Sequence, residues 1–154
     1  MKICDNTSVG IFVWKEEKLL LIERARFPAG FELPAGHVDG DDTFEIAAIR
    51  ELKEEVGLDA TNINLILEER KENECRREGG SWHYWKLYKA DAMGDIHPSV
   101  EETKKVDWYS IDDIKQLSLK TEDYLNKKIT EEDWTKSPGL EPVMYEFFKK
   151  LNII

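Results

Sequence analysis

A chain of 154 residues, 41% of them hydrophobic, can bury an apolar core without disulfides or a structural metal, so residues 1–154 are interpreted as a single domain. The formal net charge of −10 argues against a nucleic acid polymer or an anionic membrane as partner, because the average surface field repels both. The longest apolar run, Val9 to Trp14, is too short to span a bilayer and no leader-like segment stands out, so a cytoplasmic location is expected.

The first forty residues read as strands followed by a loop. Residues 7–15 and 18–24 are apolar and rich in β-branched side chains, and the two acidic residues between them predict a β-hairpin. Residues 27–40 contain two prolines and three glycines, which predicts a loop with a short strand at 31–33.

A helical pattern runs from Thr43 to Val56. Asp42 or Thr43 is suited to cap its N-terminus, and Gly57 is suited to end it. We expect this helix to be the most regular element of the chain.

The second half mixes strands and helices. Residues 63–69, 82–90 and 106–109 have strand patterns. Ser110 and Asp113 predict a capped short helix to about residue 117, and residues 142–151 form an amphipathic terminal helix. The chain is therefore assigned to the α+β class.

The two cysteines, Cys4 and Cys75, lie far apart in the sequence and form no CxxC pair. This spacing indicates neither a disulfide framework nor a thiolate zinc site. Two free thiols are expected.

Three glutamates of the predicted helix, Glu51, Glu54 and Glu55, stand at positions i, i+3 and i+4. They share an arc of roughly 100° on the helix surface, so their carboxylates converge. Small or apolar residues border this arc, namely Phe44, Ala47, Ala48 and Leu52. The acidic face therefore adjoins the apolar face.

Carboxylates at this spacing repel one another unless a cation neutralises them. Mg²⁺ is the natural candidate, because it takes oxygen ligands and leaves positions for phosphate oxygens and water; Mn²⁺ is a possible substitute. An ordinary solvated charged face is the alternative interpretation. Arg50, four residues before Glu54, can orient that carboxylate, and Gly36 with Gly40 gives the preceding loop freedom to approach a bound group.

The segment from Gly36 to Leu58 closely resembles the Nudix box, which is a glycine, five residues, an acidic residue, seven residues, then Arg-Glu-apolar-any-Glu-Glu-any-Gly-apolar. The resemblance implies a MutT-like Nudix hydrolase, an α/β/α sandwich with a mixed β-sheet, and Mg²⁺ held by Glu51, Glu54 and Glu55. One departure is Asp42, where the family usually has Glu, so direct metal ligation from that position is in doubt.

The resemblance also implies a further glutamate on a later loop, which completes the metal site or acts as general base. Glu102, six residues before Trp108, matches best, and Glu101 is next. Glu55 is another candidate for the base.

Substrate contacts are expected from Arg24 and Arg26 at the end of the second strand and from Gly36, because guanidinium groups suit phosphate oxygens. A basic, glycine-containing loop near Arg76 and Arg77 is suited to close over an anion. An aromatic group can stack a base, although alternation places at least one of its members in the core: Trp82, Tyr84 and Trp85.

These features favour a Mg²⁺-dependent pyrophosphatase. It would hydrolyse a diphosphate linkage in a nucleoside diphosphate that is joined to another moiety, as in a nucleoside triphosphate or a nucleotide sugar. The alternative is a non-catalytic Nudix module that senses a nucleotide. The expected partner is a small nucleotide-like molecule, and the chain is expected to be a monomer or homodimer. The sequence leaves open which substrate is used and which phosphorus is attacked.

Overall fold

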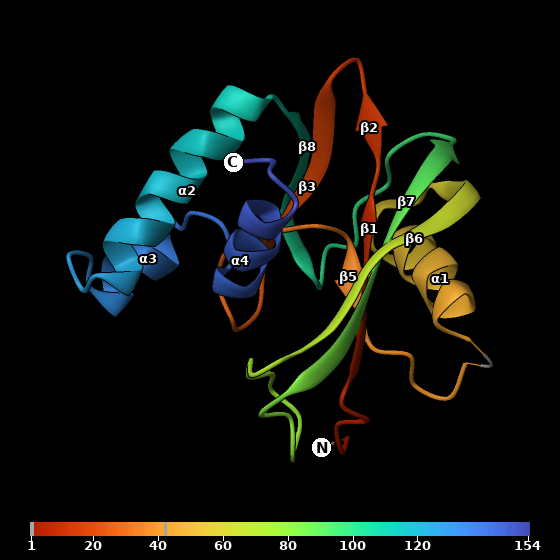
Figure 1. The fold of residues 1–154 in the computed structure, drawn as a ribbon, viewed down its shortest axis with the longest axis horizontal. Coiled ribbons are helices and arrows are strands. Elements are labelled where there is room, and N and C mark those ends of the chain that lie inside the picture. The colour runs from red at the N-terminus through yellow and green to blue at the C-terminus, as the bar shows by residue number, and fades with distance from the viewer. Residues whose placement is uncertain (1, 42) are drawn as a thin grey trace.

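The computed structural model describes residues 2–41 and 43–154. Its strands are β1 (Thr7–Phe12), β2 (Trp14–Lys15), β3 (Lys18–Arg24), β4 (Phe31–Glu32), β5 (Ala35–Gly36), β6 (Asp59–Lys71), β7 (His83–Met93) and β8 (Thr103–Tyr109). Its helices are α1 (Phe44–Val56), α2 (Ile111–Leu125), α3 (Glu131–Lys136) and α4 (Pro142–Lys150). Figure 1 shows α1 on one side of the strands and α2, α3 and α4 on the other.

The strands form two sheets. The first has the order β5-β1-β7-β6, in which β1 and β7 run parallel and the other pairs run antiparallel. In the second, β3 pairs antiparallel with β2, β4 and β8. The expected mixed sheet and α/β/α arrangement are confirmed.

The core has two halves because alternate residues of the central strands face opposite sides. Val9 and Ile11 of β1 pack with the apolar face of α1, whereas Phe12 points to the other side. There its ring lies 5.6 Å from that of Phe148 in α4. This packing fixes α1 against β1 and thereby places its acidic residues.

The hairpin expected over residues 7–24 is wrong in its first part. Of residues 7–15, only the β2 part pairs with β3, through a two-residue turn in which Glu16 and Glu17 have φ of 50° and 63°. β1 lies between β5 and β7 instead. Its residues from Ser8 to Phe12 are buried, which suits a central strand covered on both faces better than the edge of a hairpin.

Helix α1 has the expected ends. The Thr43 hydroxyl accepts a hydrogen bond from the Ile46 amide at 3.1 Å, and Gly57 ends the helix with φ of 83°. Asp42, the other candidate cap and the acidic position of the Nudix box, lies outside the described residues.

The later elements are present but longer than predicted. Strand β6 extends beyond residues 63–69 at both ends and β7 extends past residue 90, because each borders the other over most of its length. The capping box of Ser110 and Asp113 is confirmed, but α2 continues to Leu125, and the charged stretch after it contains α3. The terminal helix matches its prediction. In the described part of the chain, no helix has the length and apolar character needed to cross a membrane.

Candidate active site

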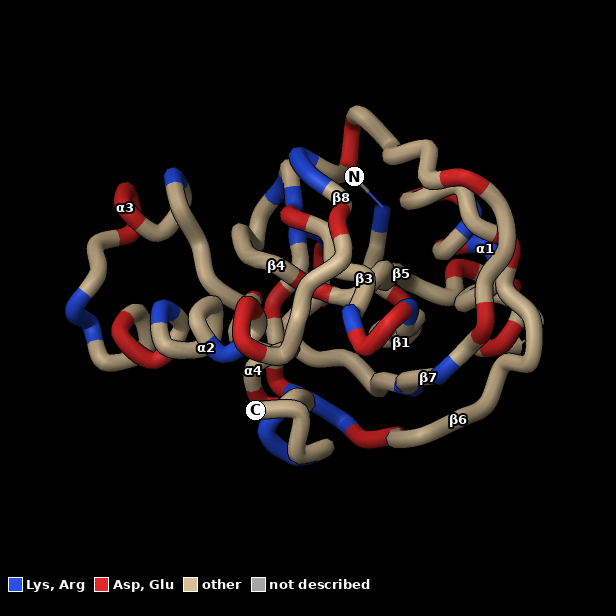
Figure 2. The backbone as a smooth tube through the Cα atoms, turned by 90° about the horizontal axis from the view of Figure 1, so that it is seen from above, with Lys and Arg blue, Asp and Glu red and all other residues tan. Residues whose placement is uncertain are grey.

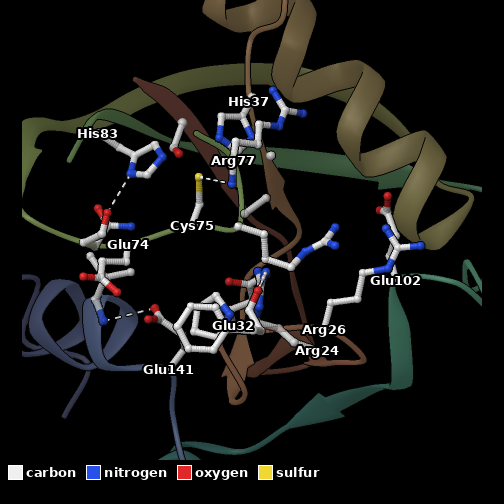
Figure 3. A pocket seen from close by; sticks show the side chains of 18 of the residues that line it. Arg24, Arg26, Glu32, His37, Glu74, Cys75, Arg77, His83, Glu102 and Glu141 are labelled. Atoms are coloured by element: carbon white, nitrogen blue, oxygen red, sulfur yellow. Dashed lines mark hydrogen bonds and ion pairs between the residues drawn. The ribbon is translucent and has the colours of Figure 1, made fainter. Parts of the chain in front are cut away.

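A cavity of about 190 Å³ lies beside the buried face of α1 (Figure 3). Its walls come from α1, the β5 segment, the ends of β3 and β4, the loop between β6 and β7, and the start of α4. Figure 2 shows acidic and basic positions close together along α1. The cavity is small, and charged side chains line it together with apolar ones.

Two of the three predicted metal ligands face this cavity. Glu51 and Glu55 are 7% and 5% exposed and belong to the buried face of α1, next to Leu52 and Val56. Glu54 is on the exposed side of the same helix. Glu54 does not line the cavity, so a metal site shared by all three carboxylates stays a prediction.

Gly36 is needed for clearance. It lies in β5, paired with Val9. A Cβ atom on Gly36 would lie 2.1 Å from Cδ of Glu51. Gly40 has the positive φ, 85°, that the expected backbone freedom of this loop requires, whereas Gly36 lies in β5 without one, and its hydrogen leaves the space that the Glu51 carboxylate fills.

Arg50 joins the acidic residues to the preceding loop. Its Nη1 donates to Oε1 of Glu51 at 2.8 Å and to Oε2 of Glu54 at 3.0 Å, so the expected contact with Glu54 is present. Its Nε donates to Oδ2 of Asp41 at 2.8 Å, and its Nη2 donates to the His37 carbonyl at 2.8 Å. One guanidinium therefore orients two carboxylates and fixes the loop between β5 and α1.

Burial dominates the ionisation of the inner carboxylates. It raises the pKa of Glu51 to about 7, although Arg50 opposes the shift. It also raises the pKa of Glu55 well above the ordinary value, and the charges of Glu32 and Glu51 add to this effect. The Ala35 amide donates to Oε2 of Glu55 at 3.3 Å. The two buried carboxylates therefore favour binding of a proton or a cation between them.

Arg24 and Arg26 both line the cavity but differ in their freedom. The Nη1 of Arg24 forms an ion pair with Oε1 of the buried Glu32. Burial raises the pKa of Glu32, which the Arg24 charge lowers in part. Arg26 is 42% exposed at its side chain and lies 3.8 Å from Glu101. The Arg26 guanidinium is thus more available to bind an anion, whereas that of Arg24 is already paired with Glu32.

The two loop glutamates, Glu101 and Glu102, differ in whether they face the cavity. Glu102 lines the cavity, and its charge contributes to the raised pKa of Glu51 and of Glu55. The backbone holds it there, because the Ala25 amide donates to the Glu102 carbonyl at 2.9 Å. The carboxylate of Glu101 is 80% exposed and pairs with Arg26. Figure 3 shows Glu102 and Arg26 together, away from His83.

A family model described as the NUDIX domain matches residues 5–132. The chain belongs to the NUDIX family. It is 27% identical to "Putative nudix hydrolase 1" of Caenorhabditis elegans over 115 residues, which are 71% of this chain and 30% of that protein. It is 41% identical over 59 residues to "RNA pyrophosphohydrolase" of Marinomonas sp. (strain MWYL1), with 38% of this chain and 37% of that protein covered. The chain thus spans about a third of these relatives.

The fold is also that of solved NUDIX proteins. A NUDIX hydrolase from Nitrosomonas europaea matches with a TM-score of 0.68 and 17% identity, covering 96% of this chain and 88% of that one. The likeness therefore extends beyond the NUDIX box to α4.

The NUDIX cavity contains groups that sequence reasoning missed. Glu141 caps α4 by accepting from the Val143 amide at 3.0 Å, and burial raises its pKa to about 8. Glu32 stands just before Gly36, outside the box, and Glu141 lies far from the box in sequence. A lone acid between apolar residues, as at Glu32, and an acid directly before a helix-starting proline, as at Glu141, were the available signals.

The structure places the basic loop at this NUDIX site, but only Trp85 of the predicted aromatic group lines the cavity. Arg76 and Arg77 line the cavity, but Arg77 is held by a bidentate ion pair with Asp39. Trp85 is buried in the core, as alternation predicted for at least one aromatic residue. Trp82 stacks under Arg70, at 4.1 Å from the guanidinium carbon to the ring centre.

Proposed function

We propose that this protein hydrolyses a diphosphate linkage in a nucleoside diphosphate derivative and uses Mg²⁺ held by Glu51, Glu54 and Glu55. The observation that carries the proposal is the pair of buried carboxylates, Glu51 and Glu55, at a cavity that arginines also line. Family membership supports the same reaction class.

A hard divalent cation fits these residues. The donor set is made of carboxylate oxygens, which Mg²⁺ and Mn²⁺ prefer. Gly36 clears space for the Glu51 carboxylate, and burial raises the pKa of that carboxyl, so a cation beside it would offset the lost hydration. When bound, the ion supplies positive charge that draws phosphate oxygens and an attacking water to the site.

Other side chains of the cavity would accept the proton and bind the phosphoryl oxygens. Glu102 would accept the proton of the attacking water, since it lines the cavity and stands outside the α1 ligand set. Arg26 would bind phosphoryl oxygens as negative charge develops on them. Arg24 would hold Glu32 in place and add positive charge near the reacting phosphate.

A second cavity of about 380 Å³ supports a place for the rest of the substrate. It shares part of its wall with the first cavity and is bordered by Tyr124 and Trp134, whose rings stack 4.1 Å apart. Phe27 lies in both walls and is 57% exposed. An aromatic face at this junction is suited to stack on a base or a sugar face next to the diphosphate.

The deciding experiment is a substrate panel of nucleoside triphosphates, nucleotide sugars and dinucleotides, assayed with Mg²⁺ for wild type and Glu54→Gln. Turnover in ¹⁸O-labelled water, read by mass spectrometry of the products, identifies the phosphorus that is attacked. We expect turnover by wild type that the variant largely loses. Tight, metal-dependent binding with intact nucleotide recovered would contradict the proposal and support the sensor alternative.

A further inference from the structure

Four potential metal ligands lie close together, and the last three of them line the cavity: Cys4, His37, Cys75 and His83. They come from the N-terminal segment, the loop after β5, the loop between β6 and β7, and the start of β7. Their donor atoms all lie within 4.8 Å of one another. Figure 3 shows His37, Cys75 and His83 facing one another. Because four separate segments contribute, the spacing of the two cysteines alone does not indicate this cluster.

The distances between donors match a tetrahedral zinc site. With Zn–S near 2.3 Å and Zn–N near 2.05 Å, tetrahedral geometry places two sulfurs about 3.8 Å apart and a sulfur and a nitrogen about 3.6 Å apart. The Sγ atoms of Cys4 and Cys75 are 3.8 Å apart. The Sγ of Cys4 lies 3.5 Å from Nε2 of His37 and 3.3 Å from Nε2 of His83. Both cysteines are free thiols.

Hydrogen bonds from neighbouring residues orient the histidine nitrogen and the two sulfurs for metal binding. The Nδ1 of His83 lies 3.0 Å from the Asn73 carbonyl, which fixes the proton on Nδ1 and leaves the Nε2 lone pair directed at the cluster. Backbone amides donate to both sulfurs: Asn6 to Cys4 at 3.3 Å and Arg77 to Cys75 at 3.4 Å. Such N–H···S bonds favour the thiolate form.

Burial lowers the pKa of His37 to about 4 and also lowers that of His83, so both imidazoles are neutral at pH 7, as metal ligation requires. Burial raises the pKa of the Cys4 thiol in the metal-free protein. Metal binding therefore displaces a proton from Cys4.

The backbone is also shaped for the cluster. A Cβ atom on Gly80 would lie 2.2 Å from Sγ of Cys75, so glycine is needed there to admit the sulfur. The Cys4 amide donates to the Glu78 carbonyl at 2.8 Å, and the Asn6 side chain donates to the Trp82 carbonyl at 2.8 Å. These bonds bring the N-terminal segment and the loop between β6 and β7 together independently of any ion.

We propose that Cys4, His37, Cys75 and His83 bind one Zn²⁺ in a closed, four-ligand structural site that is separate from the carboxylate site on α1. Soft thiolates and imidazoles select zinc, whereas the glutamates select a hard cation. With all four positions filled by the chain, the ion has no open position for substrate. Its role is to hold the loop that carries Arg76 and Arg77 against the cavity wall.

The zinc site also connects to the carboxylate site. His37 follows Gly36 directly, and its carbonyl accepts from the guanidinium of Arg50, which orients Glu51. Loss of zinc is therefore expected to loosen the loop that positions Arg50.

Metal content is the first test. Untagged protein, purified without chelator and analysed by plasma mass spectrometry, is expected to contain about one zinc per chain. After replacement of zinc by Co²⁺, the spectrum is expected to show the visible bands of tetrahedral cobalt and near-ultraviolet thiolate-to-cobalt charge transfer. Absence of both features in wild type, after reconstitution with either metal, would overturn the proposal.

Matched variants locate the site and distinguish it from the catalytic metal. Cys75→Ser, in a partly exposed loop, is expected to lose the zinc and the charge-transfer band. His97→Asn changes the one histidine outside the cluster and is expected to retain both, as is Glu54→Gln. Zinc retained by Cys75→Ser at the wild-type ratio would contradict the assignment, whatever the outcome of the hydrolase assays.

A folding control completes the design. If Cys75→Ser does not fold, wild type alone decides the question. Chelation is expected to lower its melting temperature, and added Zn²⁺, but not Mg²⁺, is expected to restore it. An unchanged melting temperature after zinc removal would refute the structural role.

Discussion

Gly36 and Glu51 fit together so closely that a single added carbon would not be accommodated: a Cβ on Gly36 would lie 2.1 Å from Cδ of Glu51 and 2.2 Å from its Oε1. The glycine that opens the NUDIX box thus gives space to Glu51, the first of the three glutamates proposed as metal ligands. β5 and α1 are held together at this point, because Glu55 of the same helix also accepts the Ala35 amide.

Gly36→Ala is therefore expected to abolish most activity by displacing the Glu51 carboxylate, and to destabilise the fold by about 1–3 kcal/mol through overpacking. Gly40→Ala is the matched control. Gly40 has φ of 85° and open space around its Cβ position, so alanine there brings a backbone cost of about 1 kcal/mol without touching Glu51. Denaturant melts and turnover measured side by side check this. Equal turnover in the two variants would show that clearance for Glu51 does not matter.

Glu54→Gln is expected to lower turnover about a hundredfold or more while leaving the fold intact. Its carboxylate is exposed and contacts Arg50, so little packing depends on it, whereas the loss of a charged ligand weakens metal binding. Steady-state kinetics over a Mg²⁺ series provide the measurement. Near-normal turnover at saturating Mg²⁺ would count against Glu54 as a ligand.

Glu102→Gln and Glu101→Gln form a natural pair, because adjacent residues of the same charge differ in whether they face the cavity. If Glu102 accepts the proton, its variant is expected to lose kcat by about a hundredfold with little change in KM. Glu101→Gln is expected to stay within a few fold of wild type. If Glu101→Gln loses more turnover than Glu102→Gln, Glu101 is the general base. If both variants stay active, Glu55 remains as the candidate base.

The NUDIX helix was predictable from sequence because its determinants are local. The spacing of Glu51, Glu54 and Glu55 sets their angular position, and Thr43 and Gly57 set the ends of the helix. The apolar neighbours also indicated which side would be buried. Local periodicity does not specify which strand lies beside which, so β1 was assigned to a hairpin although it pairs with β5 and β7.

The same limit explains the residues that were missed. Glu141 reaches the site only because α4 packs across the sheet, about ninety residues after Glu51 in the chain. His37 and Cys75 meet through a loop and a strand end whose approach depends on tertiary contacts. Buried polar groups of this kind have no period in the sequence, and a single chain offers only isolated residues such as Glu32 as hints.

The metal-free protein is expected to lose stability as pH rises from 6.5 to 8. Burial raises the pKa of Glu141 to about 8 and that of Glu51 to about 7, so the folded state holds protons that the unfolded state has released. Each such proton lowers the free energy of unfolding by up to about 1.4 kcal/mol per pH unit. The lowered pKa values of His37 and His83 act in the opposite direction, but only below about pH 6.5.

Glu141→Gln tests this dependence, because the amide oxygen can still cap α4 while the titrating proton is removed. Urea melts in chelator across the pH range are expected to give a flatter slope for the variant than for wild type. A wild-type stability that rises toward pH 8 would mean that these glutamates are ionised in the folded protein.

The last prediction distinguishes site binding on α1 from a general effect of salt. Millimolar Mg²⁺ or Mn²⁺ is expected to raise the melting temperature, since a ligand that binds only the folded state stabilises it by RT ln(1 + [L]/Kd), or about 1.4 kcal/mol at ten times Kd. That free energy corresponds to roughly 3–6 °C for a domain of this size. Sodium chloride at matched ionic strength reduces repulsion among the glutamates only by screening. The excess of Mg²⁺ over sodium chloride is expected to be lost in Glu54→Gln, measured in zinc-loaded protein so that the cysteine–histidine cluster does not contribute. Equal shifts in both salts, unchanged by the substitution, would reduce Glu51, Glu54 and Glu55 to an ordinary charged helix face and remove the physical basis of the proposed hydrolysis.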